Sequence, residues 1–182
     1  RKSIFRYLSP SDWPIWFVLF VLKINSNLSY KKQIMNGKLL GRLGHKLLPK
    51  RRAITRRNLA LAFPELSINE RNQLALEHFE AMGASLIEMG LSRWPSKKML
   101  QEFSTWEGTE HIQEALDTKQ GIIMLSAHFT SLEICGRILR YDFPEFDVVY
   151  RRNRNPFITE ILRSTREIYA RTAIEKRDIK SM

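Results

Sequence analysis

The sequence predicts an α/β fold in which a helical, membrane-associated N-terminal part leads into the start of a mostly parallel sheet with βαβ units. Three patterns predict it: an unbroken apolar run at residues 13–22, helical patterns that continue to about residue 116, and two short apolar runs after Gly121 that alternate with further helices. Because two parallel strands do not form a stable sheet alone, we expect the chain to be truncated at its C-terminal side, with the other strands beyond Met182.

The N-terminal apolar run predicts a membrane-interface segment. Its ten residues are fewer than the roughly 20 that a spanning helix needs. Trp13 and Trp16 stand at one end and Lys23 follows the other, as in interfacial anchors. We therefore predict a membrane anchor or interfacial segment at residues 1–30 and a single domain at residues 31–182. A helix buried in the core remains an alternative, because short apolar runs are ambiguous.

Helices are predicted throughout the next ninety residues. Residues 31–63 have a basic helical pattern that Pro49 divides into two. Ser67 and Glu70 have the spacing of a capping box, which opens a long amphipathic helix reaching to about Trp94. Shorter helical patterns occupy residues 97–103 and 111–116.

After Gly121 the period changes. The apolar residues 122–127 and the run 146–150 are typical of strands, and residues 130–140 and 156–169 are typical of helices. Strand, helix and strand with short connections predict a βαβ unit with a right-handed crossover.

The positive charge of the chain is concentrated near its N-terminus. The formal net charge is +11, and residues 1–60 hold 14 of the 30 lysines and arginines but one acid, Asp12. A basic end on a nearly neutral body fits either nucleic acid or an anionic membrane surface.

The composition excludes several other classes. Hydrophobic residues make up 43% of the 182 positions, so the chain is not disordered. The single cysteine, Cys135, excludes an internal disulfide and a multi-cysteine metal site. The histidines lack the spacing of a zinc motif, and we expect neither a metal nor another cofactor; they are His45, His78, His111 and His128.

His128 and Glu133 are the candidate catalytic pair. His128 directly follows the predicted strand 122–127, and active sites of open α/β sheets lie at the carboxyl ends of strands. Glu133 falls in the first turn of the next helix, where its carboxylate could orient the imidazole as a general base for a hydroxyl. Alternatively, Thr130 and Glu133 form a capping box, and the glutamate only holds the helix end.

Four motifs in order resemble one enzyme family. His128-Phe-Thr-Ser-Leu-Glu133 is similar to the His-x4-Glu block of the late acyltransferases of lipid A biosynthesis, the lauroyl and myristoyl transferases of the lysophospholipid acyltransferase superfamily. Residues 56–65, 78–83 and 150–156 resemble three further blocks of that family. The resemblance covers essentially the whole chain.

The resemblance implies an acyltransferase of lipopolysaccharide biosynthesis at the cytoplasmic face of the bacterial inner membrane. It would move a fatty acyl chain from acyl carrier protein to a hydroxyl of an acylated, Kdo-bearing lipid A precursor. His128 would be the general base, oriented by Glu133, and Arg151 would bind phosphate or the charge of the acyl intermediate. Residues 31–182 would be the N-terminal portion of one acyltransferase domain.

Three alternatives remain open at this stage. Arg151 could be a solvated charge beside Arg152 and Arg154, which both depart from the family pattern. The acceptor could be a lysophospholipid or a phosphoglycolipid. Residues 31–60 could instead form a basic nucleic-acid-binding module, although the apolar anchor and the βαβ unit with His128 argue against it, and we expect no nucleic-acid partner.

Overall fold

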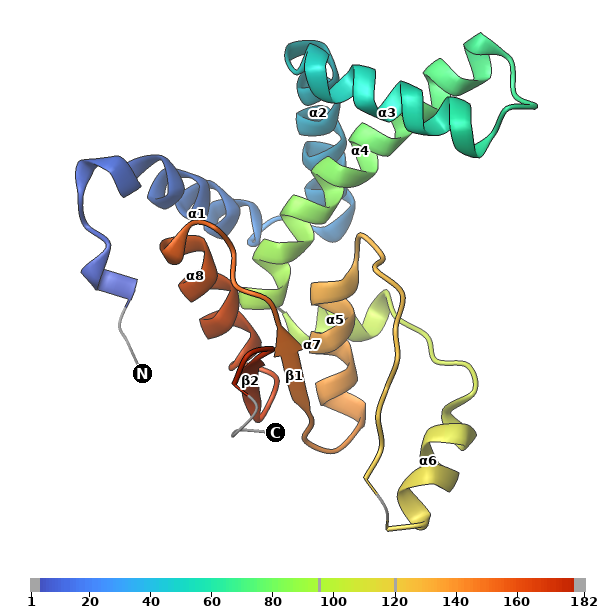
Figure 1. Cartoon of the computed structure of the whole chain (residues 1–182). Coiled ribbons are helices and arrows are strands. Elements are labelled where there is room, and N and C mark those ends of the chain that lie inside the picture. The colour runs from blue at the N-terminus through green and yellow to red at the C-terminus, as the bar shows by residue number, and fades with distance from the viewer. Residues whose placement is uncertain (1–3, 95, 120, 179–182) are drawn as a thin grey trace.

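The structure, a computed structural model, describes residues 4–94, 96–119 and 121–178 (Figure 1). Residues 1–3 of the predicted anchor and 179–182 of the predicted domain therefore lie outside the described residues. Two short 3-10 turns precede eight helices and two strands in the described ranges: η1 (Ile4–Arg6), η2 (Pro10–Asp12), α1 (Trp13–Asn25), α2 (Tyr30–Leu47), α3 (Pro49–Ala62), α4 (Ile68–Arg93), α5 (Lys97–Glu102), α6 (Thr109–Asp117), α7 (Leu132–Asp142), β1 (Asp147–Tyr150), α8 (Pro156–Arg166) and β2 (Thr172–Glu175).

Helix α4 is the long central element, and it begins where the sequence predicts. The Ser67 side chain accepts a hydrogen bond from the Glu70 amide, and the Glu70 carboxylate accepts one from the Ser67 amide, so the predicted capping box is confirmed. These bonds hold the pKa of Glu70 below its usual value. The predicted break at Pro49 is also confirmed, since this residue opens α3 directly after α2.

Helices α2 and α4 pack against each other through glycines. A Cβ atom added to Gly41 would lie 2.1 Å from the carbonyl oxygen of Phe79, and one added to Gly83 would lie 2.1 Å from that of Gly37. The two backbones are therefore in direct contact, which side chains at these positions would prevent.

The α/β class is confirmed in a small parallel sheet. Strand β1 pairs with β2 in parallel, with Asp147 opposite Thr172 and Tyr150 opposite Glu175, and α8 is the crossover between them. Strand β2 lies beside β1 in Figure 1, at the lower end of α8. The strand predicted at residues 146–150 is therefore confirmed as β1. It pairs with β2, which follows it in the chain, and not with the residues predicted to precede it.

The predicted strand at residues 122–127 is wrong. Residues 121–129 have no regular secondary structure and form the long connection from α6 to α7 in Figure 1. Ile123 and Leu125 are 96% and 98% exposed. A strand exists only through pairing, and within the described residues β1 and β2 pair with each other alone. The βαβ unit is thus β1–α8–β2.

The core lies where α4, α5 and α7 meet. Leu91, Leu100 and Ile134 form its buried cluster. A second contact holds the N-terminal turns, because the Tyr7 ring stacks on the buried Phe157 ring of α8 with centroids 4.7 Å apart. The first contact fixes α5 and α7 against α4, and the second holds the N-terminal turns against α8.

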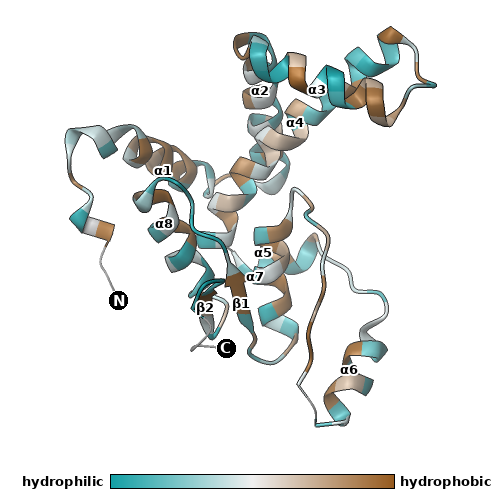
Figure 2. Cartoon of the chain, viewed as in Figure 1, coloured by the Kyte–Doolittle hydropathy of each residue, from teal (hydrophilic) through white to brown (hydrophobic). Residues whose placement is uncertain are grey.

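Helix α1 leaves most of its apolar surface exposed, which contradicts the alternative of a buried helix. Among its described residues, Leu22 and Asn25 are buried, whereas Trp13, Phe17 and Phe20 are each more than 60% exposed. Figure 2 shows the apolar colour of this helix. No helix in the described ranges is long and apolar enough to cross a membrane.

Candidate functional site

The candidate site lies at the first turn of α7, where Glu133 meets the end of α8. The Glu133 carboxylate accepts hydrogen bonds from both Nε and Nη2 of Arg166, so the pair is bidentate. It also accepts a hydrogen bond of 3.0 Å from the Tyr169 hydroxyl. The Glu133 and Arg166 side chains are 17% and 18% exposed. We call these three residues the Glu133 cluster.

Local packing explains why the cluster forms. Arg166 and Tyr169 are three residues apart at the C-terminal end of α8 and in the turn that follows, so both side chains reach the same neighbour. The Tyr169 ring lies against α7 at Gly136, where an added Cβ atom would come within 2.8 Å of the ring. The glycine therefore makes room for the tyrosine beside Glu133.

The environment of the cluster keeps both donors protonated. Burial lowers the pKa of Arg166, but the hydrogen bond and the charge of Glu133 outweigh burial, and the net pKa is raised. Burial and then the negative charge of Glu133 raise the pKa of Tyr169. At neutral pH the carboxylate is therefore held by a guanidinium ion and a neutral phenol.

The structure does not bring His128 to Glu133. His128 is exposed in the connection of residues 121–129, and no hydrogen bond or ion pair joins it to Glu133 within the described part of the chain. The connection is tied down beyond His128, because the Ser85 hydroxyl of α4 donates to the carbonyl of Thr130. His128 therefore lies just before the site without forming part of the Glu133 cluster.

The capping-box alternative for Glu133 is wrong. Helix α7 begins at Leu132 with Ser131 as its N-cap, and no side chain makes a capping hydrogen bond there. The glutamate is directed to α8 instead, so its carboxylate is held by an ion pair rather than by the helix end.

Arg151 directly follows β1 and is exposed. No ion pair involves it within the described residues, whereas the Nε atom of the neighbouring Arg152 lies 2.6 Å from the Glu175 carboxylate. The same block contains Asn155, whose side chain caps α8 by accepting from the amides of Phe157 and Ile158. The block thus fixes the turn from β1 to α8 and leaves Arg151 facing solvent.

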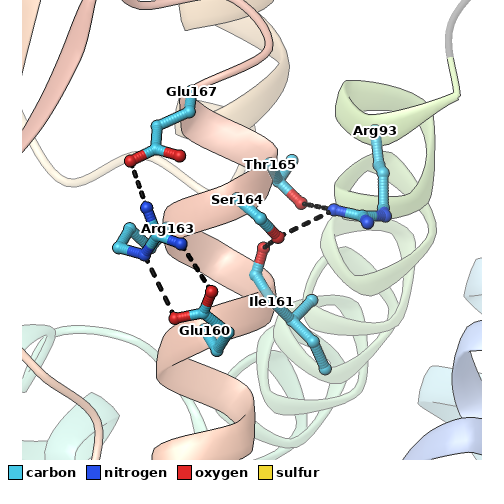
Figure 3. A network of polar contacts seen from close by, with 7 residues as sticks. All are labelled: Arg93, Glu160, Ile161, Arg163, Ser164, Thr165 and Glu167. Atoms are coloured by element: carbon cyan, nitrogen blue, oxygen red, sulfur yellow. Dashed lines mark hydrogen bonds and ion pairs between the residues drawn. The ribbon is translucent and has the colours of Figure 1, made fainter. Parts of the chain in front are cut away.

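A second polar network anchors α8 to α4 (Figure 3). Arg93, at the end of α4, donates from Nη1 to the hydroxyls of Ser164 and Thr165 at 3.1 and 3.0 Å. Burial lowers the pKa of Arg93. Along α8, Arg163 forms ion pairs with the carboxylates of Glu160 and Glu167. This network holds the helix that carries Arg166.

Sequence reasoning missed Arg166 and Tyr169. Both lie 33 or more residues beyond Glu133, and no local spacing links them to it. The sequence feature that could have indicated them is an arginine and a tyrosine three positions apart at the end of an amphipathic helix. Within the described residues, no group of three or more histidine, cysteine, aspartate or glutamate side chains could hold a metal ion.

Together, a parallel βαβ unit and a polar cluster at the start of a helix define an α/β protein with a candidate enzymatic site. The chain belongs to the bacterial lipid A biosynthesis acyltransferase family, whose family model matches residues 2–182. The resemblance seen in the four motifs is thereby confirmed.

Individual relatives agree with this assignment. The chain is 32% identical over 176 residues to the lipid A biosynthesis lauroyltransferase of Escherichia coli (strain K12), covering 96% of the chain and 57% of the relative. It is 32% identical over 150 residues to the palmitoleoyltransferase of the same strain, covering 82% of the chain and 48% of the relative. A lipid A biosynthesis acyltransferase of Haemophilus influenzae is 28% identical over 185 residues, covering 97% of the chain and 56% of the relative. The chain thus spans about half the length of these relatives, and no solved structure matches it.

Proposed function

We propose that the protein transfers a fatty acyl chain from acyl carrier protein to a hydroxyl of an acylated, Kdo-bearing lipid A precursor. The Glu133 cluster carries this proposal, because it holds a carboxylate at the start of α7, five residues after the histidine of the family motif. Family membership supplies the reaction class.

In the proposed mechanism His128 acts as the general base. Its imidazole removes the proton from the acceptor hydroxyl, the hydroxyl oxygen attacks the acyl carbonyl carbon, and the bond from that carbon to the carrier breaks. The departing group takes up the proton that His128 has removed. Arg151, exposed after β1, would bind a phosphate of the acceptor or the charge of the acyl intermediate.

Glu133 would orient His128 while Arg166 and Tyr169 act as positioning residues. A carboxylate has about four acceptor sites, and the cluster occupies three of them with Arg166 Nε, Arg166 Nη2 and the Tyr169 hydroxyl. One site is left for an imidazole N–H. Catalytic hydrogen bonds often tighten only when substrate is bound, so this mechanism requires residues 121–129 to bring His128 to Glu133 in the substrate complex.

The reaction is tested by incubating the protein with acyl carrier protein loaded with lauroyl, myristoyl or palmitoleoyl chains and an acylated, Kdo-bearing lipid A precursor. Mass spectrometry should detect one added acyl chain on the precursor. Lysophosphatidic acid and a phosphoglycolipid serve as competing acceptors. Preferential acylation of either competitor would contradict the lipid A precursor as the substrate.

We also propose that α1 lies on the cytoplasmic leaflet of the inner membrane. Trp13, Phe17, Phe20 and Ile24 are spaced so that they form one stripe along α1, and they are 63%, 67%, 61% and 52% exposed. The exposed basic residues Arg6 and Lys23 lie in η1 just before α1 and in the last turn of α1. An aromatic stripe can enter the lipid interface, while each nearby basic residue contributes about 1 kcal/mol on an anionic surface.

Replacing Trp13 and Phe17 together with serine should lower binding to vesicles that contain phosphatidylglycerol by at least about tenfold, since two exposed aromatic side chains leave the interface. Vesicle co-sedimentation across salt concentrations measures the effect. Ile68→Ser is the matched control, because Ile68 is 71% exposed at the opposite end of α4 from α1. Tighter binding of the unmodified protein to duplex DNA than to vesicles would instead favour the nucleic-acid alternative.

A further inference from the structure

A pocket of about 380 Å³ lies on the other side of α7 from the Glu133 cluster. The α7 side chains Ile134, Cys135 and Ile138 line it, whereas Glu133 and Gly136 face residues of α8 and the turn after it. Pockets that bind small molecules have volumes of roughly 300–1,000 Å³. Helix α7 thus separates the candidate site from a cavity large enough for a ligand.

The walls of this α7 pocket are mainly apolar and adaptable. Met99 and Leu100 of α5 contribute one side, and Phe103 and Trp106 follow in the connection to α6. Phe103 and Trp106 are 59% and 40% exposed, so aromatic rings stand at the solvent side of the pocket. Methionine is flexible enough to fill irregular space beside a chain, and aromatic rings offer large apolar surfaces. This lining suits an alkyl chain.

The polar part of the lining consists of the hydroxyl side chains of Ser104, Thr105 and Ser131 and of one hydrogen-bonded pair, Tyr30 and Glu88. The Tyr30 hydroxyl donates to Glu88 Oε1 at 3.1 Å, and both side chains line the pocket. Within the described residues, Glu88 Oε2 has no hydrogen-bond partner, and it is not enclosed by protein atoms. The carboxyl group therefore offers one unused oxygen to whatever occupies the pocket.

The charge of the Tyr30 and Glu88 pair determines which kind of polar group a ligand can place beside it. Burial raises the pKa of Glu88 although the hydrogen bond from Tyr30 opposes the shift, and burial with the nearby Glu88 charge raises the pKa of Tyr30 to about 12. Neither group offers a positive charge to a phosphate or a carboxylate. The free oxygen of Glu88 accepts a hydrogen bond from a neutral hydroxyl, and the carboxyl group repels such anions whenever it is ionised.

We propose that the α7 pocket binds the alkyl chain of a neutral, hydroxyl-bearing lipid, with Glu88 accepting a hydrogen bond from that hydroxyl. The pocket lies beside the helix whose first turn carries Glu133, and binding in it does not depend on the proposed reaction.

Cys135 provides a direct reporter of occupancy, because it lines the pocket and is the single cysteine of the sequence. The rate of its modification by N-ethylmaleimide is followed by mass spectrometry of the peptide that contains it. The probes are 1-decanol, its methyl ether 1-methoxydecane and decanoate. All three carry an unbranched ten-carbon chain. The alcohol offers Glu88 a hydrogen-bond donor, the ether offers no donor, and decanoate brings a negative charge.

We expect 1-decanol to protect Cys135 with an apparent affinity about tenfold higher than that of the methyl ether, as a hydrogen bond to a carboxylate allows. Decanoate should protect least. Absence of protection by every probe would overturn the pocket as a chain-binding site. Equal protection by the alcohol and its ether, or strongest protection by decanoate, would overturn the role of Glu88.

Two variants of Glu88 distinguish the contribution of its carboxylate from that of the apolar pocket. Glu88→Leu should abolish the preference for the alcohol over its ether, whereas Glu88→Gln should retain it through the amide oxygen and bind decanoate more tightly. Near-wild-type thermal unfolding confirms that each variant is folded. Because these measurements require no acyl transfer, failure here leaves the proposed reaction standing, and failure of the reaction assay leaves this binding result standing.

Discussion

Replacing His128 with alanine is expected to lower kcat/KM for acyl transfer by about two to four orders of magnitude, the usual contribution of a general base. The free energy of unfolding should change little, because His128 is exposed and has no hydrogen bond or ion pair within the described residues. Initial rates with acylated carrier protein measure the first quantity, and thermal unfolding measures the second.

His111→Ala is the matched control for this variant. His111 is an exposed histidine of α6 whose Nδ1 atom lies 3.9 Å from Glu114 in a solvent-exposed pair, and such pairs contribute little to stability. Its turnover should match that of the unmodified protein. A folded His128→Ala variant with near-normal turnover would refute the general-base assignment.

Replacing Glu133 with glutamine is expected to lower kcat/KM by about two orders of magnitude, with the loss in kcat rather than in KM. Glutamine keeps the shape of the side chain but cannot pair its charge with Arg166 or stabilise a protonated imidazole. The variant should also lose about 1–3 kcal/mol of stability, because Arg166 keeps its charge in a largely buried position without a carboxylate. Steady-state kinetics and denaturant unfolding measure the two effects.

Glu160→Gln separates the chemical loss from the structural one. Glu160 is buried and pairs with Arg163 on α8, but Arg163 retains Glu167 and none of these residues belongs to the Glu133 cluster (Figure 3). This control should lose stability and keep its activity. If Glu133→Gln retains most of its turnover, the carboxylate is a structural ion pair and does not orient the base.

The elements that the sequence predicts correctly are those with local causes. The capping box at Ser67 and Glu70 places the start of α4, and Pro49 places the break between α2 and α3. Hydrogen bonds within a few residues decide these boundaries, so the residues involved are readable in order along the chain.

The sheet could not be predicted in the same way. Residues 122–127 have the apolar run of a buried strand, yet they pair with no strand in the described ranges, whereas Thr172–Glu175 has a weak pattern and does pair with β1. Pairing depends on which segments meet in space, and the residues of a single strand carry little of that information.

The sequence by itself determined the helical segments and the cap that opens α4, the separation of a basic N-terminal part from a nearly neutral remainder, and the motif order that places the chain in its family. Only the tertiary structure decided that Glu133 meets Arg166 and Tyr169, and that Tyr30 and Glu88 face one pocket. The physical reason is separation along the chain: capping acts over three or four residues, whereas these contacts join residues more than thirty positions apart.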